Sequence, residues 1–150
     1  MYIRSFLLIA LVAISIGCAS SSKQVPQGMG DAGFSRLKNI ASFEALPKGT
    51  MVIQTKDEWK KIFSTNSQSY KQKIDFDKSM VICISWGISF SGCYDEVETI
   101  ERVEIRADEI EIVLGPLPDL GPCEMVVYPT ELVVIEKSKL PVRFSGPVPR

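Results

Sequence analysis

The chain has four cysteines and no histidine, which limits the chemistry that its side chains can perform. Without an imidazole there is no Ser-His-Asp or Cys-His arrangement and no histidine ligand for a metal ion. Cys83 lies between Ile82 and Ile84 with no base in evidence, as is typical of a small buried hydrophobe. No GxGxxG or Walker pattern supports nucleotide binding. We therefore expect a protein that is not an enzyme, with no catalytic residues, no metal site and no cofactor.

An acidic cluster could supply paired carboxylates or calcium ligands. Its members are Asp95, Glu96, Glu98 and Glu101. The spacing lacks an EF-hand loop with its glycine at the required place, so a solvated strand face is the favoured interpretation. Removing residues 1–17, and Arg4 with them, leaves 16 basic against 18 acidic residues, a net charge of −2. This balance argues against nucleic acid as a partner, because phosphate neutralisation needs a basic stripe.

The first 17 residues have the pattern of an export signal. Arg4 supplies the positive charge, and residues 6–16 form an apolar stretch shorter than the roughly 20 residues of a membrane-spanning helix. Residues 15–18, Ser-Ile-Gly-Cys, resemble the bacterial lipobox, whose cysteine is diacylated on sulfur and becomes the mature N-terminus. We therefore predict lipidation at Cys18 and a chain held at a membrane of the bacterial cell envelope; an ordinary cleaved secretory signal is the alternative. Ala19 after the cysteine favours the outer membrane if the cell is Gram-negative.

Three further cysteines meet the oxidising compartment to which the chain is exported, so one pair and one leftover thiol are expected. Cys93 and Cys123 each stand beside turn residues, and we predict a disulfide between them. Closing a loop of about 30 residues would stabilise the fold by about 3–4 kcal/mol in the chain-entropy model. Metal binding by three scattered cysteines is the weaker alternative.

A helix start is indicated at Thr55, which can cap free backbone N–H groups, with Glu58 three residues later to complete a capping box. The residues that then share one helical face are Trp59, Ile62 and Phe63. The spacing predicts a helix of about ten residues that ends near Asn66 and lays an aromatic face on the core.

Residues 80–86 form the only long apolar run outside the N-terminus and predict a central strand buried on both faces. Alternation of apolar and charged residues predicts a hairpin of 102–106 and 109–114, with Glu109 and Glu111 on the face in water. Weaker strand signals lie at 34–43 (a strand or a short turn of helix), 51–54, 74–77, 125–128, 132–135 and 141–144. Three prolines make residues 115–122 a long loop.

These elements predict an α+β domain. We expect a mostly antiparallel β-sheet, as a sandwich or half-open barrel, with one amphipathic helix packed on it. The expected organisation is a lipoprotein signal peptide at 1–17, a flexible lipid-anchored tether at 18–33, a single globular domain at 34–145 and a loose tail at 146–150.

Two loops are candidates for a binding surface. Trp86, Phe90 and Tyr94 surround the turn at 87–92, and aromatic side chains at loops are typical interface anchors. Leu117 and Leu120 belong to the long loop, and such loops in compact domains are usually functional or disordered. Packing of Trp86 and Tyr94 at the strand ends is the alternative. We expect Trp86 in the core and Phe90 exposed.

Most of the mature chain, residues 53–144, resembles the C-terminal domain family of PrcB, a lipoprotein subunit of a bacterial protease complex. The residues that carry the resemblance are Asp75-Phe76, Gly87, Ser91-Gly92-Cys93-Tyr94, Val127-Tyr128-Pro129, 132–135 and 141–144, preceded by the capped helix start at 55–59. Cys93 departs from the pattern, which tends to have a second glycine there. The resemblance implies a lipid-anchored accessory protein that stabilises an exported protease and has no catalytic residues.

The functional expectation is thus a non-enzymatic envelope lipoprotein that binds or stabilises another exported protein, with a protease as one candidate. The alternative is a small-ligand-binding or inhibitor-type module whose turn at 87–92 or loop at 115–122 enters a pocket.

Overall fold

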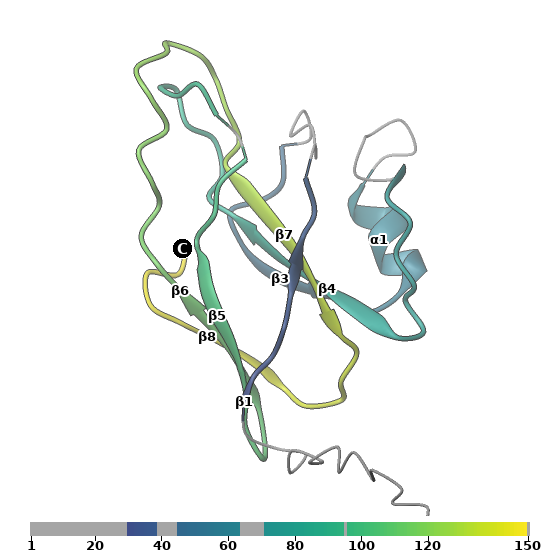
Figure 1. Cartoon of the computed structure of the whole chain (residues 1–150). Helices are drawn as coiled ribbons and strands as arrows, with labels where there is room; N and C mark the ends of the chain where they lie inside the picture. The colour runs from purple at the N-terminus through teal and green to yellow at the C-terminus, as the bar shows by residue number, and fades with distance from the viewer. Residues whose placement is uncertain (1–29, 39–44, 64–70, 95, 150) are drawn as a thin grey trace, which may run out of the picture.

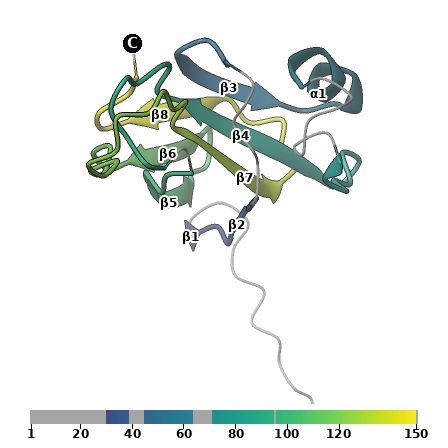
Figure 2. The same ribbon diagram turned by 90° about the horizontal axis from the view of Figure 1, so that it is seen from above.

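The computed structural model describes residues 30–38, 45–63, 71–94 and 96–149, which contain two four-stranded sheets and one helix. The strands are β1 (Gly30–Asp31), β2 (Ser35–Arg36), β3 (Gly49–Ile53), β4 (Ser79–Ser85), β5 (Ile100–Ile105), β6 (Ile110–Leu114), β7 (Thr130–Glu136) and β8 (Val142–Ser145), and the helix is α1 (Lys56–Ile62). Sheet A has the order β1-β5-β6-β8, and sheet B has the order β2-β7-β4-β3. In Figures 1 and 2, α1 lies on the side of sheet B that faces away from sheet A. The predicted α+β class is confirmed, and of the two expected forms, sandwich or half-open barrel, the structure has the sandwich.

The centre of the fold is β4, which pairs with β3 on one side and with β7 on the other. Successive residues of a strand point to opposite faces, so the side chains of β4 enter two separate cores. Met80, Ile82 and Ile84 are buried between the two sheets, and Val81 and Cys83 are buried on the other face. The predicted strand buried on both faces is therefore confirmed. Burial raises the pKa of the Cys83 thiol to about 12, which keeps it neutral.

The helix α1 covers the second face of sheet B with Trp59 and Phe63, whose ring centroids lie 4.3 Å apart. The predicted capping box forms: the Glu58 N–H donates to Thr55 Oγ1 at 3.2 Å, and the Thr55 N–H donates to Glu58 Oε2 at 3.0 Å. The helix ends after seven residues, fewer than predicted, because Phe63 adopts extended backbone angles (φ −108°, ψ 129°). The predicted end falls within 64–70, outside the described part of the chain.

Two shorter segments differ from the prediction. Residues 74–77 do not form a strand: the N–H of Asp77 donates to Asp75 Oδ1 at 3.1 Å, and the N–H of Ser79 donates to the Asp75 carbonyl at 2.8 Å. A turn of this kind satisfies the backbone locally and delays the strand to Ser79. The segment 34–43 contributes only the short β2, and its residues from 39 onward lie outside the described part.

Both ends of the described chain pack onto the sandwich. The strand β1 pairs with β5 inside the segment 18–33 that the sequence assigns to a tether. Residues 1–29, with the lipidation candidate Cys18, lie outside the described part. At the other end, the predicted loose tail is wrong, because Val148 packs against the core between the sheets and its N–H donates to the Gly146 carbonyl at 2.9 Å.

A buried carboxylate, Glu131 of β7, links the two sheets. Its side chain is only 2% exposed. Oε2 accepts hydrogen bonds from the Thr99 N–H at 2.5 Å, the Thr99 hydroxyl at 2.9 Å and the Ile100 N–H at 2.8 Å. Oε1 accepts from Arg36 Nε at 2.9 Å, and Arg36 Nη2 donates to the Ile100 carbonyl at 2.7 Å. Because β2 and β7 belong to sheet B and Ile100 begins β5 of sheet A, this carboxylate holds the sheets together at one end.

Glu131→Gln should lower the free energy of unfolding by about 2–4 kcal/mol, because it leaves buried donors and Arg36 without a charged acceptor. Glu136→Gln on the same strand is the control, since Glu136 is exposed and its loss should cost less than about 0.5 kcal/mol. Urea unfolding followed by tryptophan fluorescence measures both. Equal effects of the two substitutions would contradict a linking role for Glu131.

Candidate functional site

Two loops come together at one end of the sandwich, residues 87–94 after β4 and residues 115–128 after β6. Figure 1 shows them projecting beyond the sheets, at the end opposite the β5–β6 turn. Ser89 and Val127 exchange two backbone hydrogen bonds, of 2.8 and 2.9 Å. Two further backbone bonds run from the Gly92 N–H to the Cys123 carbonyl at 2.8 Å and from the Cys93 N–H to the Leu120 carbonyl at 2.6 Å. We call these two segments the tip.

The tip is stapled by the disulfide between Cys93 and Cys123, so the predicted pairing is confirmed. The chain is closely packed around the staple. A Cβ on Gly121, whose φ is +87°, would lie 2.9 Å from Cys93 Sγ, and a Cβ on Gly92 would lie 2.8 Å from a methyl group of Val127. Both positions therefore need glycine for the two segments to approach this closely.

Under the tip lies a small core of Val97, Leu120 and Val127. Leu120, predicted as part of a binding surface, is buried at 8% exposure, so that prediction is wrong: the loop turns Leu120 inward to cover Val127. Leu117 is half-buried against the same core. Trp86 is half-buried and packs against both this core and the one between the sheets, in line with the expectation that it belongs to the interior.

The outer side of the tip is apolar. Phe90 is 74% exposed and Tyr94 is 63% exposed. Ile88, Met125 and Val126 are each about half exposed. Among the described residues these five are all of the exposed large hydrophobic side chains, and together we call them the tip patch. A monomeric protein that gathers its exposed apolar side chains in one place commonly uses them to bind a partner.

The sequence identified Phe90 and Tyr94 but missed the other three members of the tip patch. Residues 125–128 read as a strand, which would place every second side chain in a core. In the structure this segment makes one isolated bridge, between Val127 and Ser89, and the preceding Glu124 makes another with Gly92. Without a strand partner on both sides, Met125 and Val126 both remain exposed. Ile88, next to a glycine in a turn, had no periodic pattern that could have revealed it.

The acidic cluster does not converge on a site. Glu96, Glu98 and Glu101 are exposed, and Asp95 lies outside the described residues. Across the described residues, no group of three or more cysteine, aspartate or glutamate side chains could hold a metal ion.

A hollow of about 170 Å³ is lined by the basic residues Arg36 and Lys38 and by the acidic residues Glu96, Glu98 and Glu131. Both carboxylate oxygens of Glu131 already accept the hydrogen bonds that link the sheets. Glu98 Oε2 lies 3.8 Å from Arg36 Nε. The hollow is smaller than the roughly 300–1,000 Å³ of most ligand sites. A wider hollow of about 460 Å³ at the base of the tip is lined by Lys48, Trp86, Ile88 and Tyr128 among others.

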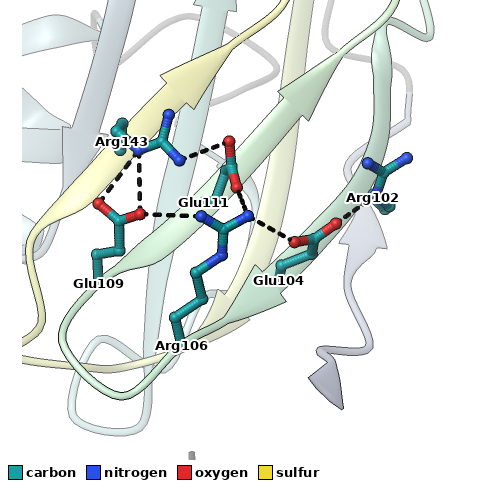
Figure 3. Close-up of polar contacts among 6 residues, drawn as sticks. All are labelled: Arg102, Glu104, Arg106, Glu109, Glu111 and Arg143. Carbon is teal, nitrogen blue, oxygen red and sulfur yellow. Dashed lines mark hydrogen bonds and ion pairs between the residues drawn. The ribbon is translucent and has the colours of Figure 1, made fainter. Parts of the chain in front are cut away.

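The outer face of sheet A carries a network of charged side chains, drawn in Figure 3: Arg102, Glu104, Arg106, Glu109, Glu111 and Arg143. Glu104 and Glu111 stand opposite each other on β5 and β6, which by itself is unfavourable. Arg106 lies between them, 3.0 Å from Glu104 and ion-paired with Glu111. Arg143 of β8 contacts Glu111 from the other side at 2.8 Å.

The side chains of this network form ion pairs with one another, and its three arginines and three glutamates balance in charge. The prediction that Glu111 faces water is wrong: its side chain is 7% exposed because two arginines enclose it. The ion pairs on this face therefore stabilise the fold, whereas the exposed side chains of the tip patch have no such role.

No helix in the described part of the chain is long and apolar enough to cross a membrane. No family model, curated protein or solved structure matches this chain.

The network makes stability depend on pH. Hydrogen bonds from Arg102 and Arg106 lower the pKa of Glu104 below its ordinary value of 4.5. A carboxyl group whose pKa is lower in the folded state stabilises the fold above the unfolded-state pKa, and that contribution is lost as the pH falls through the folded-state pKa. Glu104→Gln should therefore destabilise the chain more near about pH 7 than near about pH 3. Urea unfolding at both pH values measures this, with Glu136→Gln as control; an equal loss at both would contradict it.

Proposed function

We propose that this chain is a non-enzymatic lipoprotein of the bacterial cell envelope that binds another exported protein through the tip patch. The observation that carries the proposal is that the exposed large apolar side chains of the described residues gather on one disulfide-stapled tip. An exported protease is the candidate partner, because the sequence resembles the PrcB family. The lipobox-like Ser-Ile-Gly-Cys supports the location.

The tip has the physical properties of a binding element. Aromatic side chains dominate interface energetics because each can bury about 150–250 Å², and Phe90 and Tyr94 leave most of their surface free for a partner. The disulfide and the backbone bonds between the two segments order the tip before any encounter. A pre-ordered loop loses less conformational entropy on binding, so more of the contact energy appears as affinity.

The alternative function is a small-ligand-binding module or an inhibitor-type module, and the projecting shape of the tip favours the inhibitor-type module. A tip whose apolar side chains point outward suits insertion into a cleft of another protein, as an inhibitor-type module would do. A small-ligand module would instead need a hollow that encloses the ligand, and hollows of about 460 Å³ beside Trp86 and Tyr128 and of about 510 Å³ beside Trp59 and Phe76 are present. Both the accessory and the inhibitor forms of the proposal use the same tip patch on a protein partner.

Photocrosslinking tests the tip directly. With benzoylphenylalanine in place of Phe90, irradiation of the bacterial envelope should give a discrete covalent adduct with another exported protein. The same probe in place of Asp108, which is exposed at the opposite end of sheet A, should give no such adduct. Immunoblotting and mass spectrometry of the adducts provide the readout. The proposal fails if position 90 gives no adduct, or the same adducts as position 108.

Membrane anchoring is tested by Cys18→Ser. Two or more acyl chains give stable anchoring, so the unmodified chain should move from the membrane fraction to the soluble fraction after cell lysis. Cys83→Ser is the matched control, because that thiol is buried and should leave the distribution unchanged. Unchanged partitioning of the Cys18→Ser chain would contradict lipidation at this residue.

A further inference from the structure

We infer that the pocket receiving the tip patch is apolar and bordered by lysine or arginine side chains on a protein partner. This inference rests on the proposed function and names the chemistry of its partner. It comes from the acidic residues at the outer part of the tip.

The sequence has no lysine or arginine in residues 87–101 or in residues 107–136, the two stretches that include the tip. Both stretches do contain acidic residues. Asp119 and Glu124 belong to the tip, and Glu96 follows its first segment in the chain. All three are exposed.

The pairing within the tip places Glu124 and Asp119 beside the tip patch, and Glu96 lies at the base of the tip. Glu124 bridges to Gly92, between Phe90 and Tyr94 in the chain. Asp119 adjoins Leu120, whose carbonyl accepts the Cys93 N–H. Glu96 bridges to Thr130, where the second loop returns to β7. The apolar centre with its acidic border has the layout of a protein interface, in which a dry centre is surrounded by a polar rim.

Some positive charge lies beside Glu96, because Arg36 and Lys38 line the same hollow as this residue. Arg102, Arg106 and Arg143 are engaged with glutamates on the outer face of sheet A. Within the described residues, Lys48 beside Gly87 brings a positive charge to the base of the tip, and Arg36 reaches Glu98. No ion pair to Glu96, Asp119 or Glu124 is formed among the residues that the structure describes.

An acidic border decides between the two surfaces that an apolar tip could enter. Bacterial and other anionic bilayers carry a negative surface potential, which repels carboxylates and attracts basic segments. A protein pocket with basic side chains at its edge attracts the same carboxylates, speeds the encounter and sets the orientation of binding. The charges around the tip patch therefore favour a protein pocket over a lipid surface.

The tip points away from β1, where the described chain begins, and this position agrees with a protein pocket as its binding partner. The described chain begins at β1, where Gly30 pairs with Ile105 beside the β5–β6 turn. The tip lies at the other end of β5, before Ile100 (Figure 1). A strand of six residues is about 20 Å long, so the tip lies on the far side of the domain from β1. We infer that, with Cys18 lipidated as proposed, the tip can reach a partner in the envelope.

The test uses the full lipidated chain with benzoylphenylalanine at position 90, in isolated envelopes at about 50 mM and about 500 mM NaCl, a range over which surface charges become screened. The tip variant is Glu96→Lys with Glu124→Lys. The control is Asp108→Lys with Glu136→Lys, which changes the net charge equally at exposed positions away from the tip. Circular dichroism and the mass of the oxidised chain establish that both variants fold and form the disulfide.

The yield of the protein adduct at low salt should fall roughly tenfold in the tip variant and stay within about twofold in the control. High salt should lower the yield of the original chain and reduce the difference between the variants. An adduct whose yield is insensitive to salt and to both variants overturns the basic border but leaves the proposed function standing. Absence of any adduct at position 90 overturns the proposed function itself.

Two further outcomes would assign the tip patch to another occupant. Cosedimentation of the unlipidated Cys18→Ser chain with vesicles of phosphatidylethanolamine and phosphatidylglycerol, abolished by Phe90→Ser, would identify a lipid surface and overturn the inference. An adduct of twice the chain mass that contains only this sequence would identify a second copy and overturn it as well. An adduct with a different exported protein, crosslinked at apolar residues next to lysine or arginine, supports it.

Discussion

The fold depends on the burial of β4 on both of its faces. A strand whose successive side chains are all apolar cannot present either face to water, so sheet B must be covered twice. Sheet A supplies one cover and α1 supplies the other, with Trp59 and Phe63 over Val81 and Cys83. The remaining elements are arranged around that requirement, which explains why the described residues, with one short helix, form three layers (Figure 2).

The Glu131 carboxylate is the polar counterpart of this apolar constraint. It accepts hydrogen bonds from Thr99 and Ile100 of the segment entering sheet A and from Arg36 of sheet B, so the two sheets meet at the end from which the tip projects. Such a buried charge is tolerated because several donors compensate for its lost hydration. The tip therefore extends from a base whose geometry is set by both sheets.

The two kinds of surface on this domain serve different ends. On the outer face of sheet A, the arginines and glutamates of the network pair with one another. The tip does the opposite: the staple and the small core beneath it keep Phe90 and Tyr94 in water, where they cannot contribute to folding. Exposed apolar side chains held in this way are the basis of the proposed protein-binding function, and the acidic residues around them are the basis of the partner chemistry inferred from it.

The sequence by itself determined β4, the start of α1, the hairpin of β5 and β6 and the Cys93–Cys123 pair. The first three have local sequence patterns, and the disulfide required only a choice among a few possible pairings. A capping box needs four residues, an apolar run needs seven, and three cysteines allow only three pairings. Tertiary structure alone decided the parallel pairing of β8 with β6, the burial of Leu120 and of Glu111, and the exposure of Met125 and Val126. These depend on which distant segment lies alongside, and the physical reason is that burial is a property of the neighbours of a residue and not of its type.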